Sequence, residues 1–257
     1  MNTPNATWNE NALACRGIKQ KREEIALLLR CVPATAVSLF VVSVVCMNWL
    51  ANKTIVQTSW IALDGGILIS WLSFLCMDII TKHFGARASN MIALFATAVN
   101  LLVSLVFYIA SVIPSSADDY TALNEILGGT WFILLGSTVA FLVSAAVNNG
   151  LNGSIGRIFR QNPDSKVAYA ARSYISTFVG QFVDNFIFAV IVFVIFAPIF
   201  WDGFHWTLLQ CSTCALTGAV AELIMEVIFS PLGYKTVMRW KKQQVGKDYL
   251  AYIQGEE

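Results

Sequence analysis

The chain has 257 residues, of which 56% are hydrophobic and 13% charged, and its mean hydropathy is +0.62. A soluble domain carries about 25% charged residues, so this composition excludes an ordinary water-soluble domain and predicts a protein embedded in lipid. The net charge is +1. We therefore expect no nucleic-acid partner, because nucleic-acid-binding proteins usually carry a clear basic excess.

Both ends of the chain are polar. The first 24 residues are mixed in charge and end in Lys21, Arg22, Glu23 and Glu24. They lack the apolar stretch of a cleavable signal peptide, and we expect residues 1–24 to form a cytosolic tail. One transmembrane domain is expected over residues 25–242, followed by a second cytosolic tail over residues 243–257.

The apolar stretches predict about six membrane-spanning helices. A spanning helix needs about 20 mostly apolar residues, and the fold class predicted is an all-α, polytopic membrane protein. The segment Ala51–Gly65, before the second span, is a candidate for a dip into the membrane. The expected spans run approximately over Ile25–Leu50, Gly66–Ile80, Ala88–Ile113, Thr130–Asn148, Ser173–Phe196 and Trp206–Phe229.

The basic residues predict the orientation of the chain. If the N-terminus lies in the cytosol, only Lys53 of the 17 basic residues falls on the outer side. Cytoplasmic loops are enriched in Lys and Arg, so both termini are predicted to be cytoplasmic. Trp60, Trp131, Trp201 and Trp206 then lie near the outer boundary, where interfacial aromatic residues are expected.

Acidic side chains inside the spans are the strongest functional signal. A charge at the bilayer centre costs at least about 2.5 kcal/mol. In the fifth span, Gln181 and Asp184 share one helical face, and Asp184 lies near the predicted midplane. In the sixth span, Glu222 and Glu226 are one turn apart and repel each other if both are ionised. These faces predict an enclosed binding cavity.

Asn148 in the fourth span and Asp78 at the end of the second extend this polar lining. Structural alternatives stand beside the functional interpretation. Small residues at a spacing of four are typical of helix-packing contacts. Asp78 can pair with Lys82 or Arg87, and Glu226 lies within reach of a C-terminal lysine.

Several kinds of chemistry are poorly served. The only histidines, His83 and His205, fall in loops on opposite faces of the predicted topology, which argues against a Ser-His dyad. The sequence has neither a Cys/His metal cluster nor a phosphate-binding glycine loop, so we expect no cofactor, no metal and no enzymatic activity. Cys211 and Cys214 form a C-x-x-C in an apolar stretch, which leaves a thiol-redox membrane protein as a minor alternative.

Three blocks of sequence resemble a known family, the queuosine precursor transporters, also called the vitamin uptake transporter family. The first block resembles the second-helix signature of the family, the next its fifth-helix motif, and the last its closing Thr-Pro-Leu-x-Tyr. The departures include Lys82, where the family usually has an acidic residue, and Asn148, near an expected Asp. The blocks are Ala51–Lys53 with Gly65–Leu68 and Asp78–Gly85, then Arg172–Asp184, then Ser230–Tyr234.

The resemblance implies import of a 7-deazaguanine precursor of tRNA queuosine across the cell membrane of a prokaryote. A guanine-like edge offers N–H donors that a carboxylate accepts, a cationic aminomethyl substituent favours a second acid, and an indole can stack on the base. The candidate substrate-binding residues are Asp184, Gln181, Glu222, Asn148, Asp78, Ser176, Trp71 and Asn52.

One rival mechanism is left open. Six helices and a compact size also suit a substrate-binding subunit of an ATP-driven, energy-coupling-factor vitamin transporter, which needs a separate ATPase module. The sequence does not decide the coupling ion or the oligomeric state.

Overall fold

The structure is a computed structural model that describes residues 20–51, 53–58, 62–114, 124, 127, 131–200 and 206–255. Within these residues, five helices are long and apolar enough to span a membrane, and a bent pair at the start brings the number to six. This confirms the predicted all-α, multi-pass fold. The predicted Asn52, Trp60, Trp201 and His205 lie outside the described residues. The side of the membrane on which the termini lie stays a prediction.

The first predicted span is not one helix. A helix over Gln20–Cys31 meets α2 (Ala34–Leu50) at 104°, so the continuous span Ile25–Leu50 is wrong. Pro33 lies at the bend; it has no N–H to donate and disfavours helical geometry in the residue before it. The buried Glu24 also accepts a hydrogen bond from Arg87 of α4 at 2.5 Å, which ties the first helix to the bundle. Of this bent pair, α2 is the helix that would cross the membrane, and it is about 26 Å long at 1.5 Å per residue.

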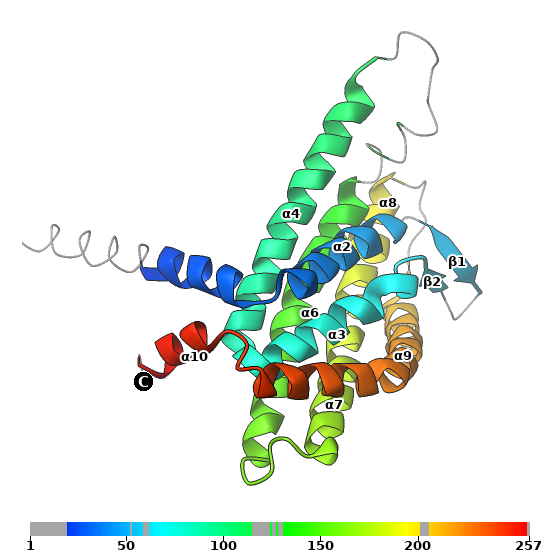
Figure 1. Cartoon of the computed structure of the whole chain (residues 1–257). Helices are drawn as coiled ribbons and strands as arrows, with labels where there is room; N and C mark the ends of the chain where they lie inside the picture. Colours follow the sequence, from blue (N-terminus) through cyan, green and yellow to red (C-terminus); the bar gives the residue numbers. More distant parts are fainter. Residues whose placement is uncertain are drawn as a thin grey trace, which may run out of the picture.

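The segment proposed to dip into the membrane forms a β-hairpin. Strands β1 (Thr54–Gln57) and β2 (Ala62–Asp64) pair antiparallel, with an irregularity in the register between Thr54 and Val56. Figure 1 shows the hairpin beside the end of α2 and the start of α3. Gly65 closes it by donating its backbone N–H to the Lys53 carbonyl at 2.7 Å.

Helices α3 (Ile67–Phe84) and α4 (Ala86–Val112) are joined by a single residue. That residue, Gly85, has φ +91° and ψ 164°, a conformation that glycine reaches without steric cost. The two helices nevertheless differ in environment. Helix α3 is the most enclosed span, whereas the outer part of α4 is apolar and exposed, as expected of a lipid-facing helix.

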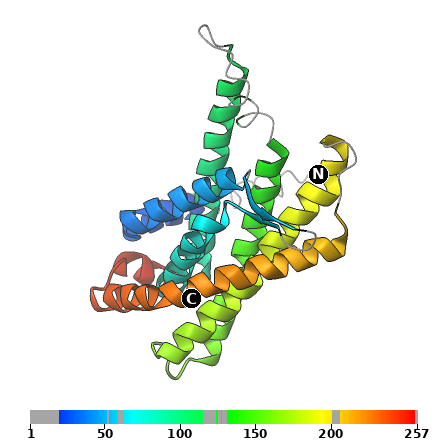
Figure 2. The ribbon, with the colours of Figure 1, turned by 90° about the vertical axis from the view of Figure 1, so that its right-hand side faces the viewer.

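The remaining spans are longer than predicted. Helix α6 (Trp131–Ile158) continues ten residues beyond Asn148, and α9 (Leu208–Lys242) continues through Pro231. Figure 1 shows α9 changing direction along its length, as an internal proline allows. The short α10 (Lys247–Gln254) follows it. Figure 2 shows α9 crossing α7, against which it packs.

The fifth span changes helix type midway. It runs as α7 (Lys166–Ala189), the π-helix η1 (Val190–Phe196) and α8 (Ala197–Phe200). Gly136 of α6 lets η1 approach closely, because a Cβ there would lie 2.9 Å from the Val192 side chain. Gly136 therefore serves as a helix-packing contact between α6 and η1.

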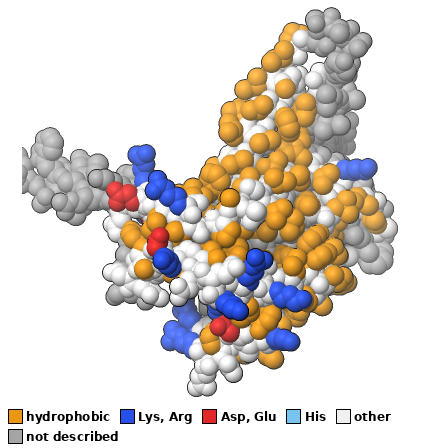
Figure 3. Space-filling view, in the orientation of Figure 1, with side chains coloured by type: hydrophobic (Ala, Val, Ile, Leu, Met, Phe, Trp, Pro, Cys, Tyr) orange, Lys and Arg blue, Asp and Glu red, His pale blue; other side chains and the backbone are white. Residues whose placement is uncertain are grey.

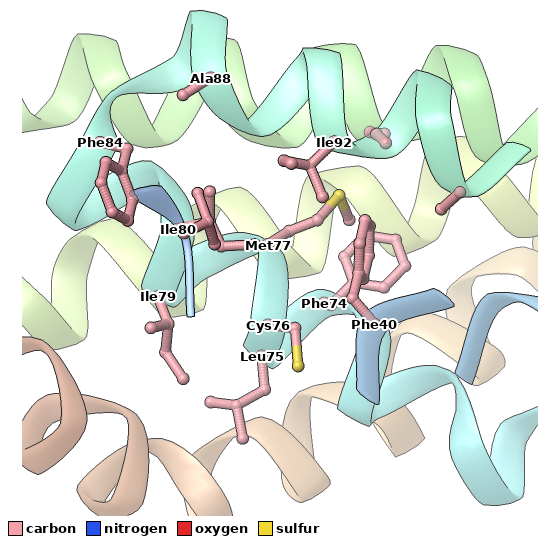
Figure 4. Close-up of a cluster of buried hydrophobic side chains, with 14 of the residues drawn as sticks. Phe40, Phe74, Leu75, Cys76, Met77, Ile79, Ile80, Phe84, Ala88 and Ile92 are labelled. Atoms are coloured by element: carbon pink, nitrogen blue, oxygen red, sulfur yellow. The ribbon is translucent and has the colours of Figure 1, made fainter. Parts of the chain in front are cut away.

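A hydrophobic core fills the space between α2, α3 and α4. Figure 4 shows Phe40 of α2 meeting Phe74 and Met77 of α3, with Ile92 of α4 above them. On the outside, Figure 3 shows an apolar band along α4, and the Lys and Arg side chains in this view lie away from that band.

Candidate functional site

A cavity of about 100 Å³ lies inside the helix bundle, large enough for several water molecules. It is found where α2 ends and α3 and α9 begin, which is the predicted outer half of the bundle. The residues that line it are Met47, Ala51, Gly66, Ile67, Ser70, Ser137, Asp184, Asn185, Phe188, Ala189, Phe193, Trp206, Cys214, Gly218 and Glu222.

Two carboxylates from different helices face this cavity. Asp184 of α7 accepts a hydrogen bond from Ser144 Oγ of α6 at 2.7 Å. Glu222 of α9 accepts one from Ser70 Oγ of α3 at 2.5 Å. Each acid is therefore held by a hydroxyl from a neighbouring helix, which fixes its direction. The prediction that the polar faces of the fifth and sixth spans enclose one cavity agrees with this geometry.

Asn185 adds an amide to the cavity that the sequence analysis did not select. Its Nδ2 atom is buried and has no hydrogen-bond partner among the described residues. The side chain reaches the wall formed by Gly218 of α9, where a Cβ would lie 2.6 Å from Nδ2. Its position four residues after Gln181 was the available signal, because it continues the same helical face.

Aromatic rings form the apolar wall. Phe188, Phe193 and Trp206 line the cavity, and the rings of Phe193 and Trp206 stack with centroids 4.4 Å apart. Trp206, predicted as an interfacial residue, also donates its backbone N–H to the Phe193 carbonyl. The ring of Trp71 stacks on Phe229 at 4.0 Å, and Trp71 is not part of the cavity lining. Its stacking on a substrate stays a prediction.

Asp78 lies in a second polar layer, closer to the opposite end of the bundle. It is completely buried and pairs with Lys82 at 2.7 Å, which is the contact that the structural alternative expected. Ser173 donates to the same carboxylate oxygen. The other oxygen accepts from Asn152 Nδ2 at 2.8 Å and from Asn148 Nδ2 at 3.4 Å. Neither Asp78 nor Asn148 is among the residues that line the cavity, and their part in substrate binding stays a prediction.

The sequence profile described as "Putative vitamin uptake transporter" matches residues 64–236. The chain belongs to this family. It is also 31% identical over 156 residues to a protein of Bacillus subtilis (strain 168) named "Probable queuosine precursor transporter"; the match covers 58% of this chain and 64% of that relative. No solved structure matches the chain.

The residues matched by the family model include most of the residues that line the cavity. Among the cavity-lining residues only Met47 of α2 and Ala51, which follows α2, lie outside the matched range.

Two further predicted residues are placed elsewhere in the bundle. Gln181 is completely buried one turn below Asp184, and neither amide atom has a partner among the described residues. Ser176 donates to the Arg172 carbonyl of its own helix at 2.6 Å.

Close packing separates the cavity from the Asp78 layer. A Cβ at Gly180 of α7 would lie 3.0 Å from Asn148 Cβ and 3.2 Å from the Phe74 ring. Helices α3, α6 and α7 therefore meet tightly at this level. This contact lies between Asp184, which lines the cavity, and the layer of Asp78.

Metal and redox chemistry receive no support within the described part of the chain. No group of three His, Cys, Asp or Glu side chains there could hold a metal ion. Cys211 and Cys214 are not joined in a disulfide, and Cys211 is fully buried. Cys214 lines the cavity, whereas Cys211 does not.

Proposed function

We propose that the protein imports a small nucleobase-like metabolite, a 7-deazaguanine precursor of tRNA queuosine, across the cell membrane. The observation that carries this proposal is one cavity with two carboxylates, an amide and an aromatic wall, inside a bundle of the vitamin uptake transporter family. The name of the Bacillus subtilis relative supports the substrate class.

The cavity suits the chemistry of a guanine-like edge. The ring N–H and amino group of such a base are donors, and an ionised carboxylate is an acceptor with two oxygens. In the proposed complex, Asp184 accepts these hydrogen bonds. Asn185 Nδ2, which has no partner among the described residues, donates to the base carbonyl.

The rest of the cavity complements the ring and its substituent. Phe188, Phe193 and Trp206 provide flat apolar surfaces for a heterocycle. A cationic aminomethyl group would be drawn to the second acid, Glu222, because charge-assisted hydrogen bonds are stronger than neutral ones. The same arrangement disfavours anionic ligands such as nucleotides, which two carboxylates would repel.

Queuosine in tRNA provides the test. The chain is expressed in a bacterial strain that lacks both queuosine synthesis and its own importer, and each 7-deazaguanine precursor is supplied at low concentration. The wild-type chain should restore queuosine. Asp184→Ala should abolish it at equal membrane abundance, and the matched control Asp248→Ala, at an exposed position of α10, should not. Full queuosine with Asp184→Ala would overturn the proposed site.

The same experiment addresses the rival mechanism. Rescue by the chain alone in a foreign host excludes a dedicated ATPase module. If no precursor restores queuosine although the protein is in the membrane, import by the chain alone is refuted. Tight ligand binding by the purified protein would then favour a substrate-binding subunit.

A further inference from the structure

We call the second polar layer, around Asp78, the charged layer. Among the described residues, its buried charged side chains are two acids, Asp78 and Glu226, and one cation, Lys82. The Lys82 ammonium contacts Asp78 Oδ2 at 2.7 Å and Ser173 Oγ at 2.5 Å, and it lies 4.0 Å from the centre of the Tyr169 ring. A lysine has three N–H donors. The contacts with Asp78, Ser173 and the Tyr169 ring therefore use its bonding capacity, and its charge balances that of Asp78.

Glu226 of α9 is the additional acid in this layer. Its side chain is 1% exposed, and both of its oxygens lack a hydrogen-bond partner among the described residues. The Ser173 hydroxyl is within reach, but its single hydrogen is donated to Asp78. Ionised in this place, Glu226 would be a buried anion without a single donor, which is among the costliest arrangements in a protein interior.

The charged groups around Glu226 come from both helices packed against α9. Helix α3 contributes Asp78 and Lys82, which interact electrostatically with Glu226. Helix α7 contributes Tyr169 and Arg172, and the hydrogen bonds of Arg172 run to the Asn152 side chain and carbonyl rather than to a carboxylate. On α9 itself, Glu222 lies one turn towards the cavity. Among the described residues, Lys82 is the cation that interacts with Glu226, and it is already paired with Asp78. Arg172 interacts electrostatically with Asp78.

We propose that Glu226 is a proton-binding site that couples transport to a proton gradient, and that it carries a proton in the conformation described here. When the O–H bond of the carboxyl breaks, the proton leaves to water on the side of the charged layer and the anion stays on Glu226. That anion competes with Asp78 for Lys82. The contacts among Asp78, Lys82 and Ser173 join α3 to α7. If Lys82 turned from Asp78 to Glu226, this connection between α3 and α7 would loosen.

The polar face of α7 provides a connection from this site to the cavity. Thr177 and Gln181 lie between the two layers, and their side-chain polar atoms have no partner among the described residues. Buried polar groups of this kind are rare in folded proteins. Their position between Asp184 and the layer of Glu226 is suited to transient hydrogen bonding with a proton carrier such as water.

The first test measures the proton itself and needs no substrate. The infrared absorption spectrum of the purified full chain at neutral pH should contain the C=O stretch of a protonated buried carboxyl, and each variant is compared with the wild type by subtracting their spectra. Glu226→Gln should remove this band, Glu226→Asp should shift it, and the exposed control Glu23→Gln should keep it. Absence of the band in the wild type, or its persistence in Glu226→Gln, would overturn the proposal.

The second test concerns coupling and rests on the proposed function. Proteoliposomes are given tritiated 7-aminomethyl-7-deazaguanine, with and without an inward proton gradient. A gradient of about one pH unit supports at most about tenfold accumulation for one proton per substrate. Glu226→Gln should exchange internal for external base but lose this accumulation completely, whereas Glu23→Gln should retain it.

The two failures are distinguishable. Accumulation by Glu226→Gln equal to the wild type, or accumulation driven by a sodium gradient alone, would overturn the coupling role while leaving the import function in place. Absence of exchange by the wild-type chain would contradict the import function, and the infrared result would still decide whether Glu226 holds a proton.

Discussion

Alanine in place of Gly218 is expected to weaken ligand binding while leaving the fold intact. The new Cβ would lie 2.6 Å from Asn185 Nδ2 and 3.1 Å from its Cγ, closer than atoms can pack. The Asn185 amide is the end of a flexible side chain, so it can rotate away. It would then leave the cavity and no longer donate to a bound base.

The magnitude follows from one lost hydrogen bond, which contributes about 0.5–1.5 kcal/mol net. The dissociation constant should therefore rise by about twofold to about twelvefold, since about 1.4 kcal/mol is a factor of ten. Thermal stability should change little, because alanine is favoured over glycine in a helix by up to about 1 kcal/mol.

Isothermal titration of the purified protein with 7-aminomethyl-7-deazaguanine measures this effect. The matched control is Gly150→Ala in α6, where a Cβ meets nothing within 4 Å; it carries the same chemical change without touching the cavity. An unchanged dissociation constant for Gly218→Ala, or an equal loss for Gly150→Ala, would refute the assignment of Asn185 to the site.

Further predictions concern the charged layer, the predicted stacking residue and the topology. Lys82→Met should destabilise the protein by about 3–5 kcal/mol because it leaves a buried charge unpaired, and adding Asp78→Leu should recover much of the loss in thermal unfolding in detergent; no recovery would contradict the pairing. Trp71→Ala should change the ligand dissociation constant less than Phe193→Ala does, measured by the same titration, and the reverse order would return Trp71 to the site. A fluorescent protein fused after the last residue should fluoresce and alkaline phosphatase fused there should be inactive, whereas active phosphatase would reverse the predicted orientation.

Hydropathy predicted the spans because a bilayer demands a minimum apolar length, but it did not predict where helices end. Asn152 continues α6 beyond the apolar stretch because its side chain is used by Asp78 at 2.8 Å. Such a contact with a residue 74 positions away leaves no local trace in the sequence. The break at Pro33 did leave a trace, and apolar residues on both sides concealed it.

In the candidate site, too, local sequence patterns predicted some features, and contacts between distant residues determined the others. Helical periodicity placed Asp184 and Glu222 on polar helix faces, because an α-helix repeats every 3.6 residues, and both residues line the cavity. It did not single out Phe193, which lies in the π-helix η1, where the repeat is wider than in an α-helix. Depth along the helices placed Asp78 at the end of its span and Asp184 near the midplane, but it did not predict the close packing of Gly180 against Phe74 and Asn148.

The central claim is that Asp184 binds the base inside the bundle, and direct binding to the purified protein tests it most closely. Titration with 7-aminomethyl-7-deazaguanine should give a dissociation constant for Asp184→Asn that is about tenfold to about a hundredfold higher than that of the wild type, since hydrogen bonds to a charged group contribute about 1.5–3 kcal/mol. The control Asp248→Asn should match the wild type. Equal affinity of Asp184→Asn and the wild type would contradict the account.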